Sequence, residues 1–180
     1  MCIRDSCGIV LEVGRRLVQM KHRPRRTVRV VLFANEEFGL SGARAYAAAH
    51  LAEIPLHVLA AESDLGSGKI LRLSTRVKAE ALPRIAEIVE LLKPLGVRDS
   101  GNEGFGGADL IPLVAAGVAV ADFHPDATRY FDLHHTANDT LDKVDPKGLD
   151  HSVAAHLVLA LFAAEAPGVF GPIAPPGPRR

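Results

Sequence analysis

The strongest constraint on the fold is the alternation of short apolar runs with segments of helical periodicity. The apolar runs predict buried strands at residues 27–33, 56–61 and 118–123, and residues 69–75 alternate as in a short strand or hairpin arm. Helical spacing of apolar side chains predicts helices over residues 9–20, 41–51, 80–92, 108–116 and 146–166. Strands that alternate with helices form a largely parallel sheet covered on both faces, so the sequence predicts a three-layer α/β/α domain.

A pair of adjacent carboxylates, Glu36 and Glu37, follows the first apolar run. A solvated surface turn would accommodate such a pair without difficulty. At the end of a buried strand, however, two ionised carboxylates need a strong partner, and a metal ion is the obvious one. One carboxylate then binds the metal while its neighbour handles a proton.

Two later segments favour the metal. Glu62-Ser63-Asp64 ends the apolar run at 56–61, and His134-His135 lies in a long loop that spans residues 124–145. Ligand sites in open α/β sheets form at the carboxyl ends of the strands, where these residues are expected. Oxygen and imidazole ligands without a thiolate are typical of catalytic zinc rather than structural zinc.

These segments resemble the M28 family of zinc aminopeptidases and carboxypeptidases, and within it the carboxypeptidase Q branch. The similar stretches occur in order at residues 26–37, 62–66, 106–109 and 130–140, and the resemblance extends from about residue 11 to about residue 166. The four stretches together are specific, whereas each alone is weak.

The resemblance implies a role for each matching residue. Glu36 would be the general base, Glu37 and His135 would bind one zinc ion, and Asp64 would bind a second. His134 is interpreted as a loop neighbour of the ligand. Residues expected to orient ligands or contact substrate are Asp109, Tyr130 and Asp139.

The start of the chain departs from the family. The family adds a His-x-Asp motif upstream and an aspartate that bridges both metals, and the sequence holds no such motif before Glu36. Asp5 lies near the bridging position, but its spacing does not fit. We interpret residues 1–7 as a non-native start, residues 8–166 as the C-terminal part of a catalytic domain whose N-terminal part is missing, and residues 167–180 as a disordered tail rich in Pro and Gly.

Composition limits the partners. Lys and Arg number 21, as do Asp and Glu, and this balance without a basic patch argues against nucleic acid. No apolar run reaches the ~18 residues of a membrane span. Cys2 and Cys7 are the only cysteines and support no disulfide framework. The expected partner is a peptide substrate, a homodimer remains possible, and the resemblance implies secretion or a periplasmic location.

The sequence therefore predicts a zinc-dependent exopeptidase, an amino- or carboxypeptidase or a dipeptidase, that is inactive as this fragment alone. Two alternatives remain open. One is a non-catalytic M28-like binding domain, and the other is a single-zinc enzyme similar to glutaminyl cyclotransferase. Retention of a base beside a ligand at Glu36 and Glu37 favours the peptidase.

Overall fold

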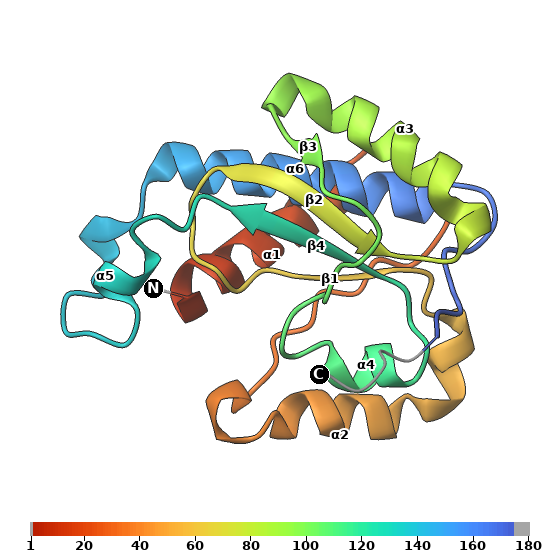
Figure 1. Cartoon of the computed structure of the whole chain (residues 1–180), viewed down its shortest axis with the longest axis horizontal. Helices are drawn as coiled ribbons and strands as arrows, with labels where there is room; N and C mark the ends of the chain where they lie inside the picture. Colours follow the sequence, from red (N-terminus) through yellow and green to blue (C-terminus); the bar gives the residue numbers. More distant parts are fainter. Residues whose placement is uncertain (1, 175–180) are drawn as a thin grey trace.

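A mixed four-stranded sheet forms the centre of the computed structural model, which describes residues 2–174 (Figure 1). Its strands are β1 (Ala60–Glu62), β2 (Ile70–Arg76), β3 (Arg98–Asp99) and β4 (Val120–Pro125), in the spatial order β1-β4-β2-β3. The ladders β1·β4 and β2·β3 are parallel, and β2·β4 is antiparallel. The predicted fold class, with a mostly parallel sheet between helices, is confirmed.

Two helical layers cover the sheet. The α-helices are α1 (Cys2–Val18), α2 (Ser41–Ala49), α3 (Leu82–Leu92), α4 (Ile111–Ala115), α5 (Tyr130–Leu133) and α6 (Pro146–Glu165). Helices α1 and α3 pack against α6, which lies on β2, while α2 packs against α4 (Figure 1). Short 3₁₀ helices are η1 (Glu36–Phe38), η2 (Leu51–Leu56), η3 (Ala79–Ala81), η4 (Lys93–Leu95) and η5 (Leu141–Lys143). None of the helices within residues 2–174 combines the length and apolarity needed to cross a membrane.

Two hydrophobic clusters hold these layers together. The larger joins the strands to α3, α4 and α6, with Leu73, Ile88 and Val120 fully buried. The smaller joins α1 to α6 through Ile9, Val13 and their neighbours. Helix α6 begins at a well-formed N-cap, because the side chain of Asp145 accepts hydrogen bonds from the first free amides of the helix.

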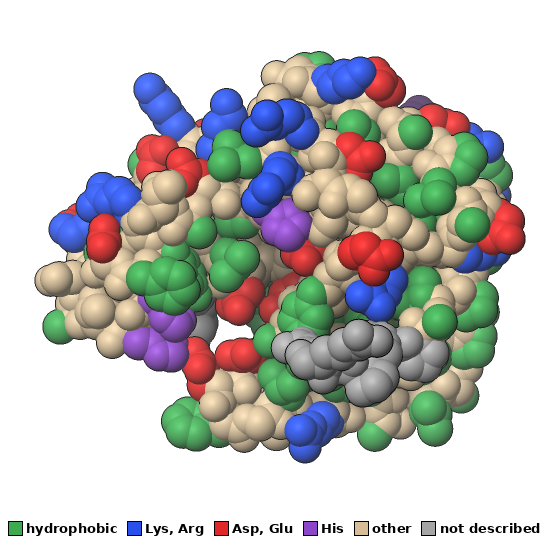
Figure 2. Space-filling model, viewed as in Figure 1, with side chains coloured by type: hydrophobic (Ala, Val, Ile, Leu, Met, Phe, Trp, Pro, Cys, Tyr) green, Lys and Arg blue, Asp and Glu red, His purple; other side chains and the backbone are tan. Residues whose placement is uncertain are grey.

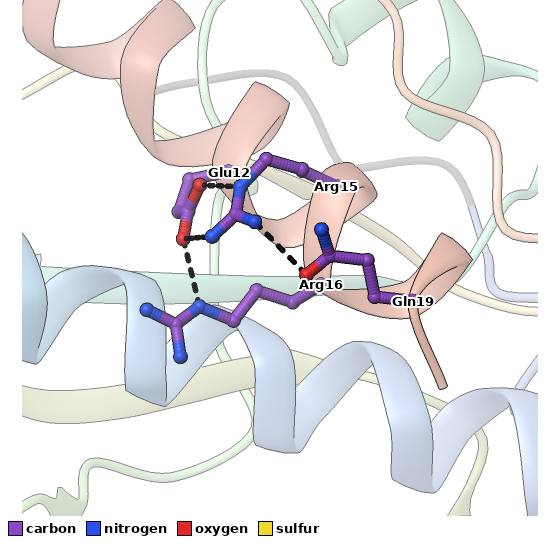
Figure 3. Close-up of polar contacts among 4 residues, drawn as sticks. All are labelled: Glu12, Arg15, Arg16 and Gln19. Carbon is purple, nitrogen blue, oxygen red and sulfur yellow. Dashed lines mark hydrogen bonds and ion pairs between the residues drawn. The ribbon is translucent and has the colours of Figure 1, made fainter. Parts of the chain in front are cut away.

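The outer face of α1 carries a charged network instead (Figure 3). Both oxygens of Glu12 accept hydrogen bonds from Arg15 at 2.6 Å, and Arg16 donates a third at 2.7 Å. Arg15 also donates to Gln19 at 2.9 Å. These pairs are exposed, so they solubilise the helix more than they stabilise the fold.

The strand predicted at residues 27–33 is wrong. This segment is extended but pairs with no strand among residues 2–174. Its apolar side chains still pack, Val28 on the α1–α6 cluster and Phe33 on the main core. Arg29 fixes its outer side through hydrogen bonds to Tyr46 at 2.8 Å and Glu53 at 2.9 Å. The apolar run therefore predicted more burial than the structure shows, since Val30 is 36% and Leu32 51% exposed, and strand formation also needs a neighbouring backbone.

Several other elements begin at residues that differ from the prediction. The strand predicted at residues 56–61 begins only at Ala60, because η2, which contains Pro55, extends to Leu56 and residues 57–59 form an irregular connection. The predicted loop at 124–145 contains α5, and β3 was not predicted. Helix α1 starts earlier than the predicted residue 9, at Cys2.

The predicted disordered tail is wrong for its first half. Phe170 is 1% exposed within the main core, and Lys78 N–H donates to its carbonyl at 2.9 Å. Ile173 is also buried, and its N–H donates to Gly117 O at 3.0 Å. The Pro- and Gly-rich composition predicted disorder, although Phe170 and Ile173 are buried. Residues 175–180 of the predicted tail lie outside the described residues.

We expect Phe170→Ala to lower the free energy of unfolding by about 3–5 kcal/mol, because it removes a fully buried aromatic ring. Urea denaturation measures the change. Val169→Ala is the matched control, since Val169 is 48% exposed and should cost about 0.5 kcal/mol or less. Equal effects of the two substitutions would show that this segment is not part of the core.

Candidate functional site

The Glu36–Glu37 pair lies in a strained turn rather than at the end of a paired strand. The 3₁₀ helix η1 holds both residues and is flanked by left-handed backbone at Asn35 (φ 63°) and Leu40 (φ 59°). The amide of Gly42 donates to Ala34 O at 3.0 Å and closes the turn. Successive residues of a 3₁₀ helix point about 120° apart, so the adjacent carboxylates can serve different partners.

Glu37 meets His135 across 98 residues of sequence. His135 Nε2 lies 2.6 Å from Glu37 Oε1, and both side chains are exposed. His135 is itself left-handed, with φ 57°. Among the described residues, the non-glycine positions with positive φ are Asn35, Leu40 and His135. The first two flank the turn that holds Glu37, and the third is the histidine in contact with it. Such strained backbone gathers at functional sites because the surrounding structure enforces it there.

His134 completes a group of three possible ligands with Glu37 and His135, whose candidate atoms all lie within 4.8 Å of one another. The rings of His134 and His135 stack, with centroids 3.7 Å apart and planes 22° apart. The other face of His134 stacks on Tyr130 at 4.6 Å. An imidazole binds a metal in the plane of its ring, and nearly parallel stacked planes do not meet at one ion. This arrangement favours His134 as a support for the His135 ring.

A group of carboxylates lies beside this pair. Burial, followed by the charges of Glu36 and Asp109, raises the pKa of Asp64 to about 6. Burial and the charge of Glu36 raise the pKa of Asp109 to about 6. Burial, followed by the charges of Asp64 and Asp109, raises the pKa of Glu62 to about 8. Figure 2 shows acidic side chains gathered in a hollow, with histidine side chains at its rim. Mutually repelling carboxylates of this kind fit a bound cation.

The structure thus brings Glu36, Glu37, Asp64 and Asp109 into one electrostatic group, with His135 on Glu37. The other predicted residues are placed differently. Tyr130 is buried, and its ring packs on Phe131 as well as on His134. Asp139 N–H donates to Thr136 O at 3.1 Å and closes the turn after the histidines. A substrate role for Tyr130 and an orienting role for the Asp139 carboxylate remain predictions.

Sequence reasoning gave no role to Glu62 and set Asp5 aside for its spacing. Glu62 belongs to the matching stretch but received no role, although its pKa is the most strongly raised of the carboxylates. Asp5 falls within the start interpreted as non-native, yet it is only 3% exposed and its charge acts on Asp64. The Oδ2 atom of Asp5 has no hydrogen-bond partner among the described residues. Asp5 precedes the buried Ile9 and Val13 at four-residue spacing, so helical periodicity extended towards the N-terminus would have placed it inward.

Comparisons with known proteins agree with one another. The sequence profile of peptidase family M28 matches residues 5–160. Carboxypeptidase Q from Rattus norvegicus is 34% identical over 143 residues, and carboxypeptidase Q from Homo sapiens is 33% identical over 143 residues. Each match covers 79% of this chain and 30% of the relative, so the chain spans less than a third of the length of these relatives. The crystal structure of a peptidase M28 precursor from Shewanella amazonensis SB2B superposes with a TM-score of 0.92 at 39% identity, covering 96% of this chain and 39% of that one.

Proposed function

This chain belongs to peptidase family M28, and we propose that it forms part of a zinc-dependent exopeptidase in which Glu36 is the general base. The observation that carries the proposal is the contact between Glu37 and His135, beside a group of carboxylates that repel one another. A carboxylate and an imidazole brought together from distant segments are a donor set that zinc prefers.

The residues present fit a metal. Glu37 and His135 would hold one ion, and Asp64 would contribute to a second in the complete protein. Burial and neighbouring negative charge make the ionised form of Asp64 costly, and a cation at this position would remove that cost. Zinc bound there would act as a Lewis acid and lower the pKa of a water from about 15.7 to roughly 7.

Glu36 supplies the proton chemistry. It is half-buried, and its charge acts on both Asp64 and Asp109, so it belongs to the acidic group. Because Glu37 turns towards His135, the neighbouring Glu36 carboxylate is left to accept a proton from the attacking water. The same carboxyl group then returns the proton to the leaving amine as the peptide bond breaks.

We propose that the chain alone turns over little substrate. It spans 30% of its carboxypeptidase Q relatives, and the resemblance assigns further metal ligands to a region before residue 11. Those relatives are named carboxypeptidases, which supports a peptide substrate. The choice between an amino- and a carboxypeptidase stays open.

The test is a hybrid in which the M28 peptidase of known structure supplies the part that precedes residue 11. The hybrid should hydrolyse dipeptides in the presence of zinc, and Glu36→Gln should slow hydrolysis by roughly 10²–10⁴-fold while leaving bound zinc unchanged. Release of free amino acid and elemental analysis measure these two quantities. Hydrolysis by the Glu36→Gln hybrid at the rate of the unsubstituted hybrid would show that Glu36 is not the general base. Turnover by the unmodified chain at an ordinary enzymatic rate would contradict its proposed inactivity.

A further inference from the structure

The glycine-rich loop that carries Asp109 is held by a pair of carboxylates from neighbouring strands. Glu62 ends β1, and Asp122 lies directly opposite it on the parallel strand β4. Their side chains both accept hydrogen bonds from the backbone of residues 105–110. We call this pair the loop clamp.

Each carboxylate of the loop clamp accepts hydrogen bonds from a different half of the loop. Asp122 Oδ2 accepts from Phe105 N–H at 3.3 Å and from Gly106 N–H at 3.4 Å. Glu62 Oε2 accepts from Leu110 N–H at 3.2 Å, and the amide of Asp109 also hydrogen-bonds to the Glu62 carboxyl group. The residues before α4 are therefore fixed from both ends of the loop.

The glycines show how closely the loop approaches the clamp. A Cβ atom on Gly107 would lie 2.4 Å from the Glu62 carboxyl carbon, and one on Gly106 would lie 2.9 Å from Val120. Both glycines have positive φ, at 112° and 93°. The backbone can thus rest directly on the Glu62 carboxyl group only where no side chain intervenes.

The loop clamp has a consequence for the site, because Asp109 belongs to the same loop. Asp109 Oδ1 is buried without a hydrogen-bond partner among the described residues, and the charge of Glu36 acts on this carboxyl group. We propose that Glu62 and Asp122 are positioning residues, which hold the loop at residues 105–110 so that Asp109 stays near Glu36. The meaning of this role for catalysis rests on the proposed function, whereas the clamp itself does not.

The experiment uses the whole chain, free of zinc and labelled for NMR. Glu62→Ala should speed amide hydrogen exchange at Asp109 and Leu110 by at least about tenfold, since each amide loses its acceptor. It should also lower the titration midpoint of the Asp109 carboxyl group from about 6 towards its ordinary value, because the carboxyl group becomes less buried and moves away from the charge of Glu36. Glu62→Gln keeps an acceptor oxygen, so it should restore both readouts.

Asp99→Asn is the matched control. Asp99 also accepts a loop amide, that of Gly101 at 2.9 Å, but it lies outside the clamp and should leave both readouts at Asp109 unchanged. Asp122→Ala is the second test variant, and it still tests the loop clamp if Glu62→Ala fails to fold. It should speed exchange at Phe105 and Gly106 and lower the same midpoint.

The clamp is overturned if Glu62→Ala or Asp122→Ala folds and leaves exchange and midpoint at their wild-type values. It is also overturned if Glu62→Gln is as disruptive as Glu62→Ala. Neither readout needs zinc or turnover, so failure of the clamp and failure of the proposed peptidase are separate results.

Discussion

Replacement of His135 by alanine is expected to weaken zinc binding to this chain by more than about 100-fold. Loss of a group that merely supports a ligand already costs roughly 10–100-fold in metal affinity, so loss of a ligand should cost more. His135 holds the Glu37 carboxylate at 2.6 Å, and Glu37→Gln should have an effect of similar size because it removes the charge from that contact. Competition with a chromophoric chelator gives the affinities, and elemental analysis gives the stoichiometry.

His134→Phe is the matched control for this prediction. It keeps an aromatic ring between Tyr130 and His135 but removes both ring nitrogens. We expect this variant to bind zinc almost as tightly as the wild-type chain. A loss as large as that of His135→Ala would instead make His134 a ligand.

The number of zinc ions bound per chain tests whether the chain holds both metal sites. If the residues of this chain do not complete a second metal site around Asp64, the chain should bind fewer than two zinc ions, and bind them weakly. Two tightly held ions, one of them lost in Glu37→Gln, would mean that residues of this chain complete both sites. The buried and unpartnered Oδ2 of Asp5 is the first place to look in that case.

The sequence predicted which distant segments come together, while the metal-binding roles of their residues stay predictions. Glu37 and His135 were paired by resemblance, and the structure places them in contact across 98 residues. The alternation of helices and strands likewise predicted the layers of the fold, because burial on one face imposes a periodicity. Both signals depend on side-chain types, which a sequence states directly.

What the sequence could not predict depends on the backbone. The left-handed conformation of Leu40 runs against the preference of its side chain, so only the surrounding structure imposes it. The segment at residues 27–33 has the composition of a strand but no pairing among the described residues. The importance of Glu62 comes from the loop folded over it, which no local pattern encodes. Tertiary context decides each of these features.

Raising the pH should destabilise the zinc-free chain, which is opposite to the trend expected when carboxylates are salt-bridged. The folded state raises the pKa of Glu62 from 4.5 to about 8, so the native state binds more protons than the unfolded state between these values. The stabilisation is fully present below the unfolded pKa and is lost as the pH rises through about 8. Asp64 and Asp109 act in the same direction between their ordinary pKa of 3.8 and about 6.

The most informative window lies above about pH 6.5. Below it His156 acts in the opposite direction, because complete burial lowers the pKa of its imidazole. Between about pH 6.5 and 8.5 Glu62 dominates, and a shift of one pKa unit corresponds to about 1.4 kcal/mol. We therefore expect the free energy of unfolding to fall by about 2 kcal/mol across this window, measured by urea denaturation in the presence of a chelator.

Glu62→Gln isolates the cause. The amide cannot ionise, so the variant should show a flat profile in this window and exceed the wild-type chain in stability at its upper end. Asp142→Asn is the matched control, because Asp142 is exposed, its pKa is lowered to about 2, and it stays ionised throughout. A wild-type stability that rises with pH, or a slope that survives in Glu62→Gln, would show that burial and the neighbouring charges of Asp64 and Asp109 do not raise the pKa of Glu62 in the folded chain.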